Sequence, residues 1–78
     1  MRIIESARDH GVEDEDMLHV LRHARTYLRR DEDVVIAIGS SRSGAPLGVG
    51  VVDIEGDDPV AIHAMKLRRT WLRYLGGW

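Results

Sequence analysis

The residues best suited to chemistry lie near the carboxyl end of the chain, where a histidine precedes a run of cations. His63 is followed by four basic residues and a tyrosine: Lys66, Arg68, Arg69, Arg73 and Tyr74. Imidazole titrates near neutral pH and can accept or donate a proton, and nearby cations can stabilise charge that develops on a phosphate. These residue types suit RNA cleavage, in which a 2′-hydroxyl loses a proton and a leaving oxygen gains one.

Each of these residues also has a plain structural interpretation. A histidine at a strand end is commonly a surface or hydrogen-bonded residue, and basic residues on a terminal helix are commonly solvated or paired with acids. The distribution of charge nevertheless singles out this segment. Residues 1–62 carry seven basic and thirteen acidic side chains, whereas residues 63–78 carry four basic and no acidic ones, in a chain of net charge −2. The carboxyl-terminal segment is therefore a candidate anion-binding surface.

Other residues with chemical potential favour structural interpretations. His19 and His23 are four positions apart on a predicted helix, a spacing that can chelate a metal. They lie opposite the apolar stripe of that helix, and no third ligand stands at a motif spacing, so a solvated helix face is favoured. Trp71 and Tyr74 can stack on bases, but their helical spacing with leucines favours a core or an interface. We expect no metal and no cofactor.

Length and composition limit the class of protein. The chain of 78 residues suffices for one domain, 1–78, with a modest core, so chemistry on a large substrate would take place at a surface. The 44% hydrophobic and 31% charged residues are typical of a globular protein. There is no cysteine, and no apolar window has the length of a membrane span or the character of a signal peptide. We expect a cytoplasmic protein with no membrane association.

The apolar pattern predicts helices in the amino-terminal part. Between Glu13 and Leu28 the apolar side chains follow one helical face: Met17, Val20, Leu21, Ala24 and Leu28. Acids at the start of this segment and arginines near its end agree with the helix dipole. A shorter helical turn over Ile3 to Asp9 is expected before it, ended by Gly11 in a left-handed conformation.

Apolar β-branched and alternating stretches predict three strands. They lie at Val34 to Ile38, Leu47 to Val52 and Val60 to Ala64. Their short connections favour an antiparallel meander. A fourth strand at Arg25 to Arg30 is an alternative to the end of the long helix. In the last strand, His63 would point to the opposite face from the apolar residues on either side of it.

A terminal helix completes the predicted fold. From Lys66 onward, helical spacing places Lys66, Arg69 and Arg73 on one face and apolar side chains on another. Gly48 and Gly50 share one face of their strand, which suggests that a helix packs closely there. The predicted fold is α+β, in two layers: two amino-terminal helices, a three- to four-stranded antiparallel sheet and a carboxyl-terminal helix.

The order of motifs resembles one known family. The chain contains ARDHGV (Ala7 to Val12), an acidic helix, VVIAIGSSRSGAPLGVGVV (Val34 to Val52) and IHAMKLRRTWLRYL (Ile62 to Leu75). This order resembles the BrnT-like toxins of bacterial toxin–antitoxin systems over nearly the whole chain. The most specific pieces are the His-Gly-Val sequence that starts at His10 and the Ile-x-Ala strand that leads into an arginine-rich segment with Tyr74.

The resemblance implies a fold and an activity. That family has the RelE-like ribonuclease fold, a small antiparallel sheet with helices packed on it. A member would be a cytoplasmic endoribonuclease that inhibits translation and is neutralised by a cognate antitoxin. Where the family commonly shows Ser, Ala and Arg after the strand isoleucine, this chain has His63, Ala64 and Met65, and no glutamate follows.

The residues support two hypotheses of function. In the first, the protein is a toxin-like endoribonuclease that needs no metal and acts on RNA, free or at the ribosome. Its catalytic residues would be His63, Lys66, Arg69 and Arg73, and its RNA-binding residues Arg68 and Tyr74. In the second, the same fold is a non-catalytic interaction module whose basic helix docks an acidic or amphipathic segment of a partner protein. A homo-oligomer is compatible with either.

Overall fold

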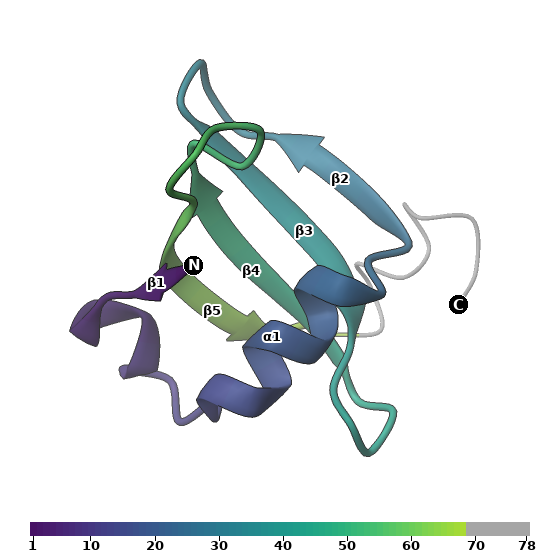
Figure 1. Ribbon diagram of the computed structural model, residues 1–78. Helices are drawn as coiled ribbons and strands as arrows, with labels where there is room; N and C mark the ends of the chain where they lie inside the picture. Colours follow the sequence, from purple (N-terminus) through teal and green to yellow (C-terminus); the bar gives the residue numbers. More distant parts are fainter. Residues whose placement is uncertain (69–78) are drawn as a thin grey trace.

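One α-helix lies across one face of a small twisted sheet (Figure 1). The computed structural model describes residues 1–68. Its elements in chain order are β1 (Arg2–Ile3), the 3-10 helix η1 (Glu5–Arg8), α1 (Asp14–Arg22), β2 (Thr26–Arg29), β3 (Val34–Ser40), β4 (Pro46–Val52) and β5 (Val60–Lys66). The five strands form one mixed sheet in the order β1-β5-β4-β3-β2. The α+β class predicted from the sequence is confirmed.

The centre of the sheet forms where β-branched residues are densest. β3 and β4 pair antiparallel over their full length, from Val34 opposite Val52 to Ser40 opposite Pro46, and β5 pairs antiparallel with the other side of β4. Strands at the centre of a sheet are buried, and burial favours Val and Ile, whose stiff branched side chains pack well on a pleated surface. The three predicted strands are confirmed, each one or two residues longer than predicted.

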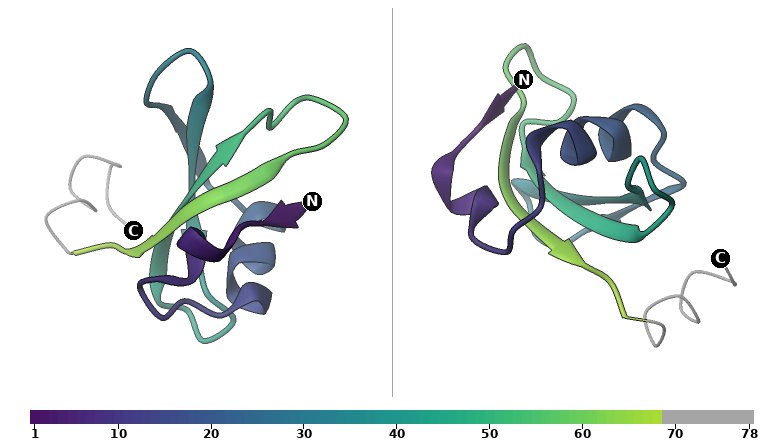
Figure 2. Two further views of the ribbon diagram at one scale, coloured as in Figure 1. Left: turned by 90° about the vertical axis from the view of Figure 1, so that its left-hand side faces the viewer. Right: turned by 90° about the horizontal axis from the view of Figure 1, so that it is seen from below.

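α1 buries its apolar face against the sheet. Met17 and Val20 are fully buried and belong to one cluster with Val49 and Val51 of β4 and Ala61 of β5. Figure 2 shows the helix over one face only. Burying an aliphatic side chain of this size contributes about 1.5–3 kcal/mol, so this layer is the main apolar core of the fold.

The glycine that lets the helix approach the sheet is Gly39. A Cβ atom there would lie 3.4 Å from Val20 Cγ1 and 3.4 Å from Ala24 Cα, both of the α1 region. The prediction that a helix packs over Gly48 and Gly50 is wrong for α1, because these glycines lie on the opposite face of β4 from the core residues. Strand alternation located the two faces correctly but could not say which one the helix covers.

The long helix predicted over Glu13 to Leu28 is wrong in its second half. α1 ends at Arg22 with His23 as its C-cap, and the chain then enters β2, which pairs with β3. The β-branched and aromatic residues of β2 favour extended backbone, and the pairing satisfies their main-chain groups. The alternative fourth strand at Arg25 to Arg30 is confirmed.

Within residues 1–68 there is one α-helix, in place of the two predicted before the sheet. The turn expected at Ile3 to Asp9 is the four-residue 3-10 helix η1. Gly11 has a φ of 74°, as predicted for a residue in the left-handed region. The residues before η1 form β1, a two-residue strand parallel to β5, so the sheet is mixed rather than antiparallel.

The helix predicted from Lys66 onward does not begin there. Lys66 is the last residue of β5, and the Leu67 N–H still donates a hydrogen bond to the Pro46 carbonyl of β4. The prediction failed at this point because pairing with β4 continues two residues beyond the predicted strand end. The rest of the predicted helix, 69–78, lies outside the described residues.

Two arginines tie the connecting segments to α1. Arg8 of η1 donates two hydrogen bonds of 2.8 Å to the Asp14 carboxylate. Arg42 of the β3–β4 loop donates to Asp16 at 2.8 Å and to Glu13 at 3.1 Å. These hydrogen bonds lower the pKa of the Asp14 and Asp16 carboxyls below the ordinary range. The pairs are solvated, so they orient the segments more than they stabilise the fold.

Candidate functional site

His63 lies within β5, on the face of the sheet that α1 does not cover. It pairs opposite Gly50, whereas the next pair, Val51 with Ala61, belongs to the core under α1. This register leaves Ile62 as the extra residue of a β-bulge. The predicted opposition of His63 and Ala64 is confirmed, because Ala64 belongs to the core under α1. On the other side of His63 the bulge shifts the alternation by one residue, so Ala61 and not Ile62 lies in the core.

Lys66 does not lie on the same face of the sheet as His63. It pairs opposite Leu47, whose side chain belongs to the core under α1, so Lys66 projects from the other face of the sheet. There it lines a hollow of about 280 Å³ together with Glu13 and Asp16. The predicted catalytic set is thus divided, with the imidazole on one face of the sheet and the ammonium beside acids on the other.

A cleft of about 270 Å³ opens beside His63 on the uncovered face. Its lining residues are Arg30, Asp31, Val34, Ile36, Gly50, Ile62 and His63, and we call it the histidine cleft. Gly50 keeps it open: a Cβ atom at this position would lie 3.5 Å from the Cβ of His63, and a longer side chain would occupy the space beside the imidazole.

A second imidazole packs against the first. The rings of His10 and His63 meet edge to face, with centroids 5.1 Å apart and planes at 81°. His10 follows η1, which lies beside the outer edge of β5 (Figure 2), where the Ser6 hydroxyl donates to the Ile62 carbonyl at 3.2 Å. Sequence spacing could not indicate this contact, because the two residues come from opposite ends of the described chain.

Arg30 supplies the positive charge of the histidine cleft. Its side chain forms no ion pair with a described residue. The nearby Asp31 carboxylate is occupied by the turn, where it accepts hydrogen bonds from the N–H groups of Asp33 at 2.9 Å and Val34 at 3.0 Å. The cleft therefore contains one imidazole and a guanidinium, and the second imidazole, that of His10, packs against His63 without lining the cleft. These are the groups that proton transfer at a phosphate needs.

The remaining predicted residues fall in two classes. Arg68 is described; it follows β5 and is exposed to solvent. Arg69, Arg73 and Tyr74 lie outside the described residues, so their roles stay predictions. His10 and Arg30 are the site residues that sequence reasoning missed, although His10 stands in the His-Gly-Val motif that carries the family resemblance.

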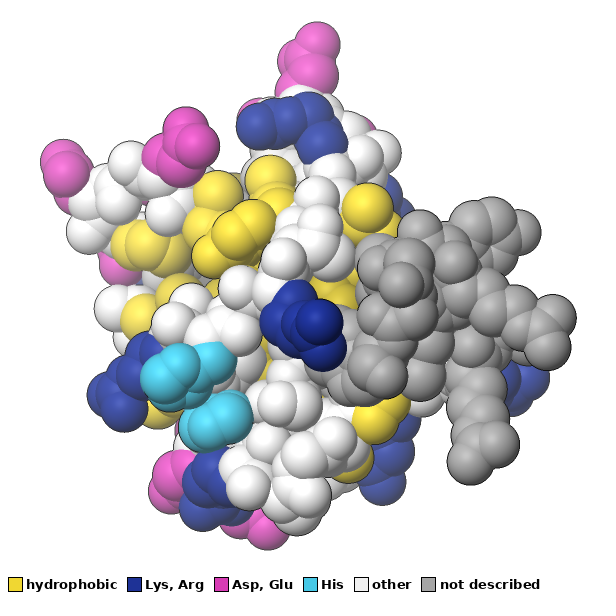
Figure 3. Space-filling view, turned by 90° about the vertical axis from the view of Figure 1, so that its right-hand side faces the viewer, with side chains coloured by type: hydrophobic (Ala, Val, Ile, Leu, Met, Phe, Trp, Pro, Cys, Tyr) yellow, Lys and Arg dark blue, Asp and Glu magenta, His cyan; other side chains and the backbone are white. Residues whose placement is uncertain are grey.

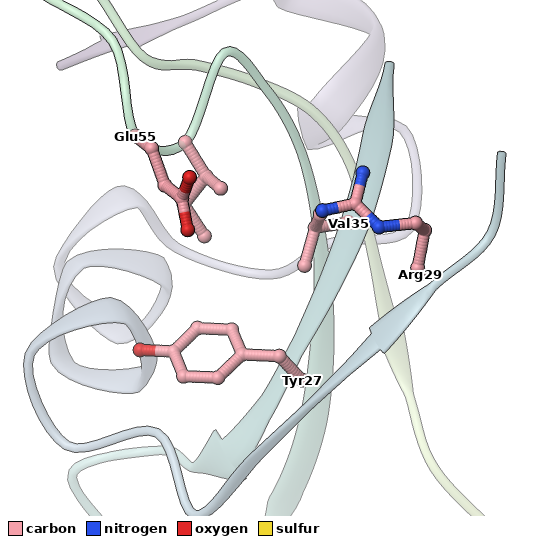
Figure 4. A pocket seen from close by; sticks show the side chains of 5 residues that line it. Tyr27, Arg29, Val35 and Glu55 are labelled. Carbon is pink, nitrogen blue, oxygen red and sulfur yellow. The ribbon is translucent and has the colours of Figure 1, made fainter. Parts of the chain in front are cut away.

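A larger hollow of about 460 Å³ lies on the α1 side of the sheet, between β2 and the β4–β5 loop. Its lining residues are Tyr27, Arg29, Val35, Ile54 and Glu55. Figure 3 looks toward the β2 edge of the sheet, where hydrophobic side chains gather between acidic and basic ones. In Figure 4, Arg29 and Glu55 border the hollow from opposite sides, and the Tyr27 ring lies along a third.

This hollow adjoins the free edge of the sheet. β2 is an outermost strand, and no described strand pairs with its outer edge. Tyr27 is 53% exposed and Leu28 is 36% exposed, which places large apolar side chains beside unpaired main-chain groups. Such an edge suits pairing with an extended segment of another protein. With apolar walls and one charge of each sign, the hollow is a binding feature rather than a centre for proton transfer.

Comparisons with family models, curated proteins and solved structures found no match to this chain. The resemblance to BrnT-like toxins therefore depends on the motif order alone. Within residues 1–68, no helix has both the length and the apolar character needed to cross a membrane.

Proposed function

We propose that the protein is the toxin of a bacterial type II toxin–antitoxin system, a cytoplasmic, metal-independent endoribonuclease that inhibits translation and is neutralised by a cognate antitoxin. The observation that carries this proposal is the contact of His10 with His63, together with the cleft that His63 lines with Arg30. The motif order that resembles BrnT-like toxins supports the proposal independently. The His-Gly-Val piece contains His10, whereas at His63 this chain departs from the serine that is common in the family.

The cleft suggests a division of roles. One imidazole takes the 2′-hydroxyl proton and the other gives a proton to the leaving 5′-oxygen, so the phosphodiester is opened by its own neighbouring hydroxyl. Arg30 pairs with the phosphate and stabilises the charge that develops on it. No metal is needed in this scheme. Lys66, on the opposite face, takes no part in it.

The charge of the body constrains the substrate. Thirteen acids precede His63, and phosphate neutralisation supplies much of the affinity of any protein for free RNA. We therefore propose that the substrate is presented by a larger assembly such as the ribosome. Local contacts to it would come from Arg30, Arg68 and the other basic residues of the carboxyl-terminal segment. A salt-sensitive, weak affinity for isolated RNA is the expected behaviour.

The proposal is tested by induced expression in bacteria. The wild type should arrest growth and fragment RNA, and co-expression with the product of an adjacent antitoxin-like gene should relieve the arrest. His63→Ala should lose both effects while circular dichroism shows a folded protein. A folded wild type that leaves growth and RNA unchanged would overturn the assignment.

A second candidate function is supported by the hollow beside β2. The protein would then be a non-catalytic interaction module, and the partner would use the exposed edge of β2 and the hollow lined by Tyr27 and Ile54. Under this alternative, Tyr27→Ala should weaken partner binding at least tenfold, and His63→Ala should leave it unchanged. Partner binding without any RNA turnover would favour this alternative over the nuclease.

A further inference from the structure

The second histidine pair of the chain lies at the carboxyl end of α1. The rings of His19 and His23 have centroids 4.7 Å apart and planes tilted by 47°. His19 is half-buried and His23 is exposed, so the interpretation of both as a solvated helix face is wrong for His19. The cleft described above uses neither residue.

One ring of this pair is already oriented. His19 Nδ1 lies 2.8 Å from the main-chain carbonyl oxygen of Ser40 at the end of β3. A carbonyl can only accept, so Nδ1 carries the hydrogen, and in the neutral ring Nε2 keeps a free lone pair. Metal-binding histidines are commonly held in this way, with one ring nitrogen donating to a carbonyl and the other free for the ion.

The separation of the rings also fits a chelate. With a metal–nitrogen bond of about 2.0–2.1 Å, a ring centroid lies roughly 3.2 Å from the ion. Two such rings at a near-tetrahedral angle have centroids about 5 Å apart, close to the observed 4.7 Å. A helix carboxyl terminus adds a negative partial charge that favours a cation. The nearest acid on the same helix face, Asp16, is already paired with Arg42.

We propose that His19 and His23 form a two-imidazole site for a divalent transition-metal ion, of the Zn²⁺, Ni²⁺ or Cu²⁺ class that imidazole prefers. Within residues 1–68 no group of three or more His, Asp or Glu side chains can hold a metal ion. Water or a ligand from another molecule therefore completes the coordination shell. The site is independent of the proposed nuclease cleft, and its occupation leaves RNA cleavage unchanged.

The chain contains its own matched control. His10 and His63 are also in contact, but their planes stand at 81°, and no described residue donates to or accepts from either ring. Each pair thus contains two histidines in contact, but only in the His19–His23 pair does a hydrogen bond orient one ring for a metal. Replacing one histidine in each pair and comparing the metal affinities therefore distinguishes a specific chelating site from adventitious binding to any imidazole.

The experiment is a titration of the full chain with Zn²⁺, and separately with Ni²⁺, by isothermal calorimetry. His23→Gln is the primary variant, because His23 is exposed and its side chain has no hydrogen bond to a described residue. We expect one ion per chain, an affinity at least tenfold weaker in His23→Gln, and an unchanged affinity in His63→Gln. His19→Gln should behave like His23→Gln, with circular dichroism to check that the fold survives loss of the Ser40 contact.

Three results would overturn the site: no binding to the wild type at millimolar metal, the same affinity in His23→Gln as in the wild type, or loss of binding in His63→Gln. An assay of RNA cleavage in the presence of a chelator keeps the two proposals distinct. If the protein cleaves RNA but binds no metal, the metal site has failed. If it binds metal but does not cleave RNA, the nuclease proposal has failed.

Discussion

The two histidine pairs of this chain contain the same side chains in contact, yet they suit opposite ligands. His10 and His63 meet edge to face, and His63 lines a cleft with Arg30, whereas the rings of His19 and His23 are tilted at the carboxyl end of a helix. A guanidinium favours an anion, and a helix carboxyl terminus favours a cation. The side chain is the same in both pairs, so the groups around each imidazole decide which ligand it suits.

The two faces of the sheet explain how the pairs came to differ. On the α1 face, β4 and β5 use Val49, Val51 and Ala61 to build a dry core. On the other face the same strands place Gly50 and His63 side by side, which leaves room for a ligand beside the imidazole. The α1 face carries the main core, whereas the other face has a smaller buried cluster of Ile36, Ile38 and Leu67 beside the cleft that His63 lines.

Charge reversal at Arg30 should give the largest effect among the changes that keep all four histidines. Arg30→Glu places a carboxylate where the phosphate would lie, and we expect RNA cleavage to fall by about 10²–10³-fold, as when a group that stabilises transition-state charge is removed. Arg30→Lys should retain part of the activity. Multiple-turnover rates on a labelled RNA measure both, and equal rates in Arg30→Glu and the wild type would remove Arg30 from the site.

Filling the cleft should have the next largest effect. Gly50→Val adds methyl groups beside His63 and should lower cleavage roughly tenfold by displacing the imidazole. Gly48→Ala is the matched control on the same strand face. Its Cβ would lie 3.3 Å from Ile36 Cγ2, so it should cost about 1 kcal/mol of stability and leave cleavage unchanged at a permissive temperature. Unchanged cleavage in Gly50→Val together with reduced cleavage in Gly48→Ala would contradict the location of the cleft.

Lys66 provides a test that separates the sequence prediction from the structure. The sequence predicts that Lys66 holds phosphate together with His63, but Lys66 lies on the opposite face with Glu13 and Asp16. Lys66→Ala should therefore change the cleavage rate by less than about twofold, in the range of a surface charge remote from the reaction. A loss comparable to that in Arg30→Glu would show that RNA contacts the α1 face.

The ion pairs of α1 should give the smallest effect, visible only as a dependence on pH. Hydrogen bonds from Arg42 lower the pKa of Asp16 below its ordinary 3.8. A carboxyl whose pKa is lowered on folding stabilises the fold fully above pH 3.8 and loses that contribution as the pH falls through its folded value. The melting temperature of Asp16→Asn should lie slightly below that of the wild type at pH 7, and the difference should shrink as the pH falls below 3.8. The exposed Asp57→Asn is the control.

Much of the fold could be predicted from residue types. β-branched runs located β3, β4 and β5, and Gly11 marked the turn before α1. The end of α1 was misplaced because Leu28 continues the helical spacing by coincidence, while strand pairing with β3 decides the conformation. β1 has only two residues, too few for any pattern to emerge, and its pairing with β5 is a tertiary contact.

The candidate site was only half predictable. His63 and the shared face of Gly48 and Gly50 could be found from types and alternation, but not that α1 leaves this face uncovered. The bulge at Ile62 and the extra length of β5 could not. Because β5 continues to Lys66, strand alternation places Lys66, three positions after His63, on the opposite face. His10 contacts His63 through tertiary structure alone, and Arg30 lines the cleft because the β2–β3 turn places it beside β3.

The central claim is that the His10–His63 pair, and not the His19–His23 pair, performs proton transfer on RNA. The most direct measurement is the single-turnover cleavage rate of ribosome-associated RNA by four purified single variants, each with one histidine replaced by glutamine. We predict that His63→Gln and His10→Gln lose about 10²–10⁴-fold, whereas His19→Gln and His23→Gln stay within about twofold of the wild type. Equal rates in all four variants would contradict the account.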